Sequence, residues 1–440
     1  MLSLEELITL DVTSVSKKRQ SLNEASAAVH VITRQDIERS GMSSLPELLR
    51  LVPGVHVAQY DANKWAISVR GFNGRWANKL LVMIDGRSVY TPLYSGVYWD
   101  AQITPLGDIE RIEVVRGPGG TLWGSNAVNG IVNIITKSSS ETVGTRADVR
   151  VANKYLAATG RYGGELNGNG WYRAYVTASE SDDYDGIDDG EAHDAWDNTQ
   201  IGFRADWRPT DLDEVTFQGD AYVGDSEQSV SVLEGLTSFP QFRQDRADLR
   251  GHNLLARWRR AHAGGSAWEV KAFYDETRRD DITLEQEIRT LDLEFHHNFS
   301  PVESHDISWG LGYRRIEDEL EGSFTVSYDP EKQNNEIISA FVQDEISIGE
   351  HVRFVFGTKL ENNDFAQSDL EFQPSARLLW KIDDGQSVWA ALSRANRTPS
   401  RTEKTVRINA AAFSLPFVDP DGPFGPLPAG APTLISFFGD

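Results

Sequence analysis

The stretch IERIEVVRGPGGTLWGSNAVNGIVNIITK, residues 109–137, decides the fold of the N-terminal part of the chain. It begins with residues 109–116, in which apolar and charged side chains alternate with the period of a half-buried strand. The glycine loop at 117–120 lacks the Lys-Ser/Thr pair of a phosphate-binding loop, so we interpret it as a backbone turn. Residues 131–135 predict a last short strand. The stretch therefore indicates a strand, a turn and a second strand.

Upstream of this stretch, the sequence predicts two short helices and three further strands. Thr33 and Asp36 form a capping-box-like pair before an apolar-periodic segment. Ser44 and Glu47 repeat the pattern at the start of a second helix. The apolar period then changes from helical spacing to two, which indicates short strands and a tight hairpin. These strands are expected at 55–57, 67–69 and 80–84. Residues 25–140 are therefore expected to form a small α+β domain.

Charge divides the chain into two parts. Residues 1–140 carry 14 basic and 13 acidic side chains, whereas residues 141–440 carry 29 and 53. This step and the serine-rich connector near residue 140 predict a domain boundary there.

With 12 Trp, 13 Tyr and 19 Phe the chain is too apolar for disorder, and its net charge of −23 argues against a nucleic-acid partner. The sequence lacks cysteine and an eighteen-residue apolar run, which excludes a disulfide scaffold and a helical membrane protein.

The acidic part has the pattern of a membrane β-barrel. About thirteen segments of 8 to 13 residues alternate with period two, and neither face is uniformly apolar, as expected between lipid and a wet lumen. They lie near 145–153, 155–164, 170–180, 198–208, 213–224, 252–262, 266–278, 287–299, 304–315, 335–346, 350–361, 370–382 and 386–394. We predict that short turns alternate with long polar loops, including 181–197, 225–251, 279–286, 316–334, 362–369 and the residues after 395.

Tryptophan placement favours the same interpretation. Seven of the eight Trp in this part lie near a predicted short turn, as an aromatic girdle at one membrane interface would place them. A soluble β-sandwich, with a lectin-like binding function, is the alternative from a different class of protein.

Four linked motifs carry a resemblance to a known family. Residues 45–57 (LPELLRLVPGVHV), 67–72 (ISVRGF), 80–90 (LLVMIDGRSVY) and 109–137 occur in the order found in the plug domain of TonB-dependent outer-membrane receptors. The resemblance implies a plug that sits inside a barrel, in the outer membrane of a Gram-negative bacterium. It also implies an inner-membrane energy-coupling protein of the TonB type as partner, outer-membrane lipid as surroundings and no enzymatic activity.

In this family the coupling protein pulls on a short N-terminal segment. Leu10, Asp11, Val12, Thr13, Ser14 and Val15 resemble that coupling box, and an extended β-prone stretch suits strand addition. A disordered tail is the alternative for the same residues. The expected organisation is a coupling segment at 1–24, the plug domain at 25–140 and a partial barrel at 141–440.

The ligand of such a receptor should contact upward-facing plug loops that are rich in aromatic and polar side chains. Aromatic side chains with polar tips give a large contact area at a low entropy cost. Packing of these aromatics against the wall is the alternative. An iron–siderophore complex is the cargo we expect, with cobalamin or an oligosaccharide as alternatives; no resident cofactor or nucleic acid is expected. The candidate ligand residues are Tyr60, Asp61, Asn63, Asn73, Arg75, Trp76, Arg87, Tyr90, Tyr94, Tyr98 and Trp99.

Two arginines are candidates for locking the plug to the wall. Arg70 and Arg116 end strands, and we hypothesise that they pair with lumen-facing carboxylates, possible partners being Asp344 and Glu345. The alternative is that both satisfy carbonyl groups within the plug.

Other clusters indicate no further site. The acidic loop 181–197 lacks EF-hand spacing, so a solvated loop is favoured over a calcium site. His296 and His297 face opposite sides of a strand and cannot chelate one ion together. Catalytic groupings with recognisable spacing are missing from the sequence.

Length is the point at which the chain departs from the family. A plugged transporter barrel of 22 strands needs about 420 residues after the plug at the spacing seen here. We therefore expect a truncated sequence that stops inside a loop, in the Pro/Gly-rich stretch 416–440. Residues 1–3 are not followed by a signal peptide, so we expect the true start to lie upstream.

Overall fold

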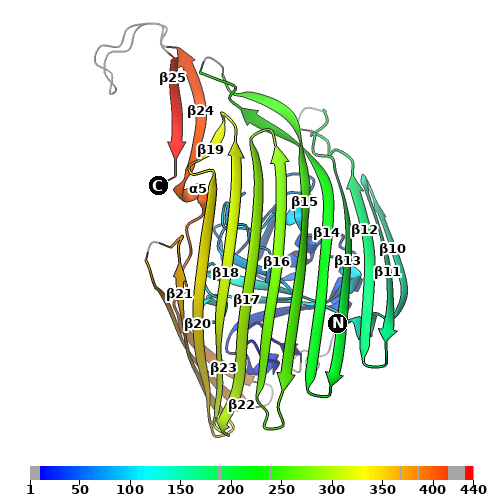
Figure 1. Ribbon diagram of the computed structural model, residues 1–440, viewed down its shortest axis with the longest axis vertical. Helices are drawn as coiled ribbons and strands as arrows, with labels where there is room; N and C mark the ends of the chain where they lie inside the picture. Colours follow the sequence, from blue (N-terminus) through cyan, green and yellow to red (C-terminus); the bar gives the residue numbers. More distant parts are fainter. Residues whose placement is uncertain are drawn as a thin grey trace.

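The computed structural model describes residues 10–186, 190–236, 239–366, 368–383, 386–414 and 432–439. A small α+β domain, here called the plug, lies on the concave side of a large curved antiparallel sheet, here called the wall (Figure 1). The fold class predicted from the sequence is confirmed. Residues 1–9 of the predicted coupling segment, 187–189 of the acidic loop, and 416–431 and 440 of the Pro/Gly-rich stretch lie outside the described residues.

The plug is built on a five-stranded sheet in the order β3-β8-β9-β6-β7. One pair, β6 with β9, is parallel, and the others are antiparallel. Side chains on one face of β3, β6, β8 and β9 form the core with the helices, and Ile112, Val114 and Val132 are fully buried. Burying one such side chain stabilises the fold by about 1.5–3 kcal/mol. The strands span Ala28–Thr33 (β3), Leu80–Ile84 (β6), Arg87–Ser88 (β7), Ile109–Arg116 (β8) and Gly130–Thr136 (β9).

The predicted capping signals mark the observed plug helices. The Thr33 hydroxyl accepts a hydrogen bond from the Asp36 amide, and the Asp36 carboxylate accepts one from the Thr33 amide. The Ser44 hydroxyl accepts from the Glu47 amide at the start of the second helix. These helices and the remaining small elements span β1 Asp11–Val12, β2 Gln20–Ser21, η1 Leu22–Glu24, α2 Arg34–Ser40, α3 Leu45–Leu48, η2 Leu49–Leu51, β4 Val55–Gln59, β5 Trp65–Val69, η3 Trp99–Ala101, η4 Leu106–Asp108, α4 Gly120–Trp123 and η5 Ser139–Thr142.

The wall contains thirteen strands, each paired with its neighbours in sequence order except where β18 pairs with β20. Every one of the thirteen predicted segments falls on one of these strands. Among the described residues β10 and β23 are the two outer strands of the sheet. The strands span Gly144–Ala152 (β10), Tyr155–Leu166 (β11), Gly170–Ser181 (β12), Trp196–Thr210 (β13), Asp213–Val232 (β14), Gln241–Ala261 (β15), Ala267–Asp281 (β16), Leu284–Val302 (β17), His305–Gly322 (β18), Lys332–Ile348 (β20), Val352–Asn363 (β21), Glu371–Asp383 (β22) and Gln386–Ser393 (β23).

Several predicted loops are wrong because the strands continue into them. The expected loop 225–251 is mostly the extended β14–β15 hairpin, and 279–286 is a tight turn between β16 and β17. Strand β18 likewise continues into 316–334. Polar residues cannot distinguish a loop from a strand that is wet on both faces. Short turns such as 211–212 and 303–304 lie at one end of the wall, here called the short-turn end; the opposite end is the long-loop end (Figure 1).

The outer face of the wall carries apolar side chains. Trp207, Trp258 and Trp380 are 50, 44 and 52% exposed and lie toward the short-turn end, which agrees with the predicted girdle. In the described residues, the helices are too short or too polar to cross a bilayer.

After β23 the chain forms structure where the sequence predicted a loop. A small sheet at the long-loop end joins β19 to β24 and β25, and α5 comes directly before β24 (Figure 1). These elements span β19 Val326–Tyr328, α5 Arg401–Lys404, β24 Val406–Ser414 and β25 Pro432–Phe438.

Candidate functional site

An aromatic cluster lies on the plug loops between β4 and η3. The Trp76 and Tyr94 ring centroids are 4.8 Å apart, and Tyr94 meets Tyr98 edge-on at 5.1 Å. The Arg75 guanidinium lies 4.9 Å from the Trp76 ring and 5.5 Å from the Tyr60 ring. Trp76 and Tyr60 are 51 and 45% exposed. This group, here called the apical cluster, offers flat aromatic faces and one cation to a ligand.

Burial modifies the chemistry of two tyrosines of the plug. Burial raises the pKa of Tyr60, although the neighbouring Arg75 opposes that shift. Burial also raises the pKa of Tyr90 to about 12. Both phenols are protonated at neutral pH, as an unperturbed tyrosine also is, and can donate a hydrogen bond.

Other predicted ligand residues are occupied by the protein itself. Arg87 pairs with Asp275 of the wall at 2.5 Å, and Asp61 pairs with Lys64 at 2.7 Å. Asn63 is buried and accepts from Ser226 Oγ. The polar groups of these three side chains already have partners within the protein.

Three more predicted residues also have protein neighbours. Asn73 Nδ2 donates to the Ala66 carbonyl, and Trp99 belongs to the plug core. Tyr98 lies under Arg279 of the wall, with 5.0 Å from the guanidinium to its ring. The structure thus brings five of the eleven predicted residues together, namely Tyr60, Arg75, Trp76, Tyr94 and Tyr98. The other six lie outside the cluster: Asp61, Asn63, Asn73, Arg87, Tyr90 and Trp99.

The plug is held against β11–β16 by acids of the plug and cations of the wall. Asp108 pairs with Arg161 and Arg173, and Asp100 pairs with Arg279 at 2.6 Å. All of these side chains are nearly inaccessible to solvent, so the charges must compensate one another.

A second anchor on this side is the Asp85-Gly86 turn. Arg257 donates to the Asp85 carbonyl and Lys271 Nζ donates to the Gly86 carbonyl at 2.6 Å. Burial would raise the pKa of the Asp85 carboxyl, but Arg204 and the hydrogen bonds from Thr136 outweigh it and hold that pKa below its usual value.

The two arginines predicted to lock the plug have other neighbours. Arg116 Nη1 donates to the Pro53 carbonyl at 2.9 Å, which is the alternative within the plug, and the Arg70 guanidinium lies beside Gly117. Asp344 accepts from His305, while Glu345 pairs with Lys18 and Arg353. The structure brings neither arginine to Asp344 or Glu345, because strand ends at 70 and 116 face the plug's own turns.

The coupling-box residues are ordered and largely buried. Asp11–Val12 (β1) pairs with Gln20–Ser21 (β2), and Val12 and Val15 are 0 and 4% exposed. Glu113 accepts from the Thr13 amide at 2.9 Å, from the Ser14 amide at 2.8 Å and from Ser14 Oγ at 2.6 Å. Residues 11–14 thus have partners within the plug, and the edge of β1 is already paired in this arrangement.

Sequence reasoning missed one segment that contacts the plug. Residues 394–405, here called the strap, run from β23 across the plug: the Arg401 amide donates to the Pro92 carbonyl and the Thr398 amide to Asn126 Oδ1. Ser400 and Glu403 form a capping box, a signal that was present in the sequence.

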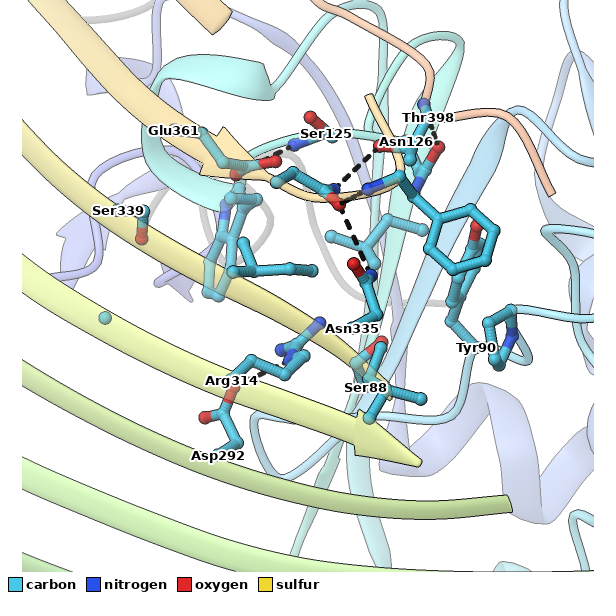
Figure 2. A pocket seen from close by; sticks show the side chains of 18 of the residues that line it. Ser88, Tyr90, Ser125, Asn126, Asp292, Arg314, Asn335, Ser339, Glu361 and Thr398 are labelled. Atoms are coloured by element: carbon cyan, nitrogen blue, oxygen red, sulfur yellow. Dashed lines mark hydrogen bonds and ion pairs between the residues drawn. The ribbon is translucent and has the colours of Figure 1, made fainter. Parts of the chain in front are cut away.

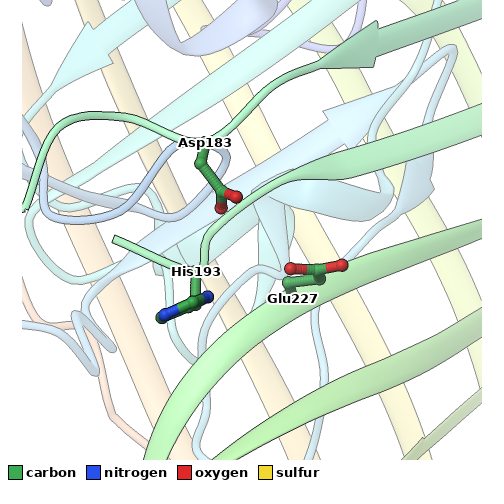
Figure 3. Close-up of side chains that lie close together, drawn as sticks. All are labelled: Asp183, His193 and Glu227. Carbon is green, nitrogen blue, oxygen red and sulfur yellow. The ribbon is translucent and has the colours of Figure 1, made fainter. Parts of the chain in front are cut away.

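Two side chains of the acidic loop and one of β14 lie close enough together to share a cation. Ligand atoms of Asp183, His193 and Glu227 lie within 4.8 Å of one another (Figure 3). One oxygen of Asp183 accepts from the amides of Asp194 and Ala195, and Asp194 accepts from the Ala62 amide of the plug. These bonds hold the loop in place without an ion. The closeness of the three ligand atoms is therefore the single observation that suggests a metal site here.

Comparisons with known proteins agree with this architecture. A model described as the TonB-dependent receptor plug domain matches residues 21–131, and one described as the TonB-dependent receptor-like β-barrel matches residues 136–432. The vitamin B12 transporter BtuB of Vibrio vulnificus is 38% identical over 148 residues, which is 33% of this chain and 23% of the relative. The probable siderophore receptor PirA of Acinetobacter baumannii is 24% identical over 475 residues, 90% of this chain and 60% of the relative.

Solved structures share the fold. The siderophore receptor PirA from A. baumannii superposes with a TM-score of 0.70 at 18% identity, covering 94% of this chain and 66% of that chain. The ferripyoverdine receptor of Pseudomonas aeruginosa gives a TM-score of 0.70 at 12% identity and covers 90% and 61%. The matches to the curated relatives above cover from 23 to 60% of the relatives' lengths.

Proposed function

Because the chain belongs to the TonB-dependent receptor family, we propose that the protein imports a scarce, bulky nutrient across the outer membrane of a Gram-negative bacterium, with an iron–siderophore complex as cargo. The observation that carries the proposal is a plug fixed in the concavity of the wall by buried ion pairs. A plug held in this way blocks passive diffusion, so passage of a bulky solute needs work done on the plug.

The apical cluster is the proposed site of cargo capture. Trp76, Tyr60 and Arg75 combine exposed aromatic faces with a guanidinium, which suits a planar or anionic chelate. The siderophore receptor PirA aligns over 90% of this chain, which supports the choice of cargo class.

Energy is proposed to come from an inner-membrane protein of the TonB type that binds residues 10–15. This segment would have to leave Glu113 before it could add as a strand to a partner sheet, because its backbone is already paired.

Cobalamin is the second candidate cargo. The relative at 38% identity is a vitamin B12 transporter, which supports cobalamin as cargo. The alignment that gives this support covers 33% of the chain.

Uptake of labelled cargo by cells separates these candidates. Cells that express the receptor in a strain lacking its own iron and vitamin receptors are offered labelled ferric siderophores, cobalamin and oligosaccharides in turn. We expect uptake of a ferric siderophore that stops when a protonophore is added. Indifference to iron chelates together with cobalamin uptake would refute the first candidate. Arg75→Ala should weaken cargo binding at the surface, whereas Arg39→Ala on α2 serves as a matched control away from the apical cluster.

A further inference from the structure

A cavity of about 90 Å³ lies between the plug and the β17–β21 part of the wall (Figure 2). This volume holds several water molecules, since one water needs roughly 15 Å³ measured in this way. Plug residues Ser88, Tyr90 and Asn126 line one side, and Thr398 of the strap lines another. The apical cluster contributes none of its five residues to this lining.

Buried acceptor atoms in the cavity lining have no protein donor. Asp292 and Asn335 are 3 and 5% exposed, and each has one Oδ1 atom without a hydrogen-bond partner. Both side chains are fixed through their other atom: Arg314 Nε donates to Asp292 Oδ2 at 2.8 Å, and Asn335 Nδ2 donates to Asn363 Oδ1 at 3.3 Å. A buried acceptor left without a donor is costly, so these oxygens need a donor from a molecule in the cavity.

The other side of the plug holds buried ion pairs beside a second, smaller cavity of about 70 Å³. There the plug acids Asp85, Asp100 and Asp108 meet wall arginines. Cavities therefore border the plug on both sides, and the β17–β21 cavity is the one whose lining includes a contact of the N-terminal segment.

The N-terminal segment borders the same cavity. Trp123 lines the cavity and donates from Nε1 to the Ser14 carbonyl at 2.8 Å. Lys17 lies 4.8 Å from the Trp123 ring centroid and pairs at 3.4 Å with Glu294, a second lining residue. Withdrawal of residues 14–17 would remove these contacts from the cavity boundary.

We propose that this cavity is an internal binding site for the solute in transit. Its unpartnered oxygens bind hydroxyl or N–H groups of a polar cargo once the N-terminal segment has been withdrawn and the cavity has widened. This inference rests on the proposed import function. It places the route on the β17–β21 side of the plug, and water occupies the acceptors between transport events.

Two single-cysteine variants test whether the cavity is hydrated. The sequence contains no cysteine, so each variant has one thiol. Ser339→Cys places it in the cavity lining, and Thr177→Cys places it at a buried wall position on β12 outside that lining. A small cationic methanethiosulfonate reagent applied to outer membranes should label Ser339→Cys and leave Thr177→Cys unlabelled. Absence of labelling at position 339 would overturn the proposal.

A pair of adjacent substitutions tests the route. Ser339→Trp fills the cavity and should lower the uptake rate by roughly tenfold or more while surface binding stays unchanged. Ile338→Trp adds a similar bulk to the outer face of the same strand, where Ile338 is 56% exposed, and should change neither quantity. Wild-type uptake by Ser339→Trp would refute the route.

Assembly of each variant is checked by heat-modifiable migration. If Ser339→Trp does not assemble, Ser339→Cys modified with a bulky thiol reagent after assembly fills the same space, and undiminished uptake would again refute the route. Failure of the unmodified receptor to import any of the cargoes would refute the proposed function instead.

Discussion

Replacing Glu113 should release the N-terminal segment from the plug. The carboxylate is fully buried and accepts from the Thr13 amide, the Ser14 amide and Ser14 Oγ. A hydrogen bond to a charged group contributes about 1.5–3 kcal/mol. All three bonds meet at Oε2, while Oε1 accepts from Arg111, so Glu113→Gln removes the charge that strengthens the three bonds and turns an NH₂ group toward Arg111. We expect a loss of about 3 kcal/mol in the local stability of the segment.

Hydrogen exchange of the Thr13 and Ser14 amides measures this loss. A loss of about 3 kcal/mol corresponds to roughly a hundredfold faster exchange if the segment opens locally. The matched control is Glu110→Gln on the same strand, since Glu110 makes no hydrogen bond with the segment. Equal protection in Glu113→Gln and the unmodified protein would refute the reasoning, as would an equal effect of both variants.

Three further predictions concern the anchors and the apical cluster. Asp85→Asn should lower the unfolding free energy of the plug by about 2 kcal/mol at pH 7. Because the folded pKa of Asp85 is depressed, its contribution is present above about pH 4 and is lost as the pH falls further, so denaturant melts of the two proteins should converge there. Arg401→Ala leaves Asp318 unpaired and should lower the free energy of local unfolding of the strap by about 3 kcal/mol. Trypsin should then cleave faster after Arg394, and equal cleavage of the variant and the unmodified protein would contradict this prediction. Trp76→Ala should weaken cargo binding by roughly tenfold in a surface-binding titration, and unchanged affinity would remove the apical cluster from recognition.

Local rules predicted the elements of the fold well. The Thr33–Asp36 capping box and the Asp85-Gly86 turn involve neighbours in sequence, so their residue types determine their geometry. The wall strands were found because the two faces of the sheet differ in polarity, which gives the sequence a period of two. Strand ends were missed at 225–251 because apolar and polar residues no longer alternate regularly there.

Contacts between distant residues were not predictable in the same way. Arg116 was matched to wall carboxylates by charge, yet its strand end faces the Pro53 carbonyl. Likewise, the sequence suggested that Arg87 would face a ligand, whereas the register of β16 places Asp275 beside it. Composition supplied the residue types of the apical cluster, and only the packed structure decides which of them remain exposed.

The Asp85-Gly86 turn has a consequence for how such receptors diversify. Both residues adopt positive φ, 51° and 83°, and the wall holds them by their carbonyl oxygens. These two carbonyl contacts depend on the shape of the turn, whereas the Asp85 carboxylate adds a side-chain contact with Arg204 of the wall. Substitutions in neighbouring plug loops that alter the cargo can therefore leave the two carbonyl contacts between this turn and the wall unchanged. Recognition and attachment can evolve separately in this protein.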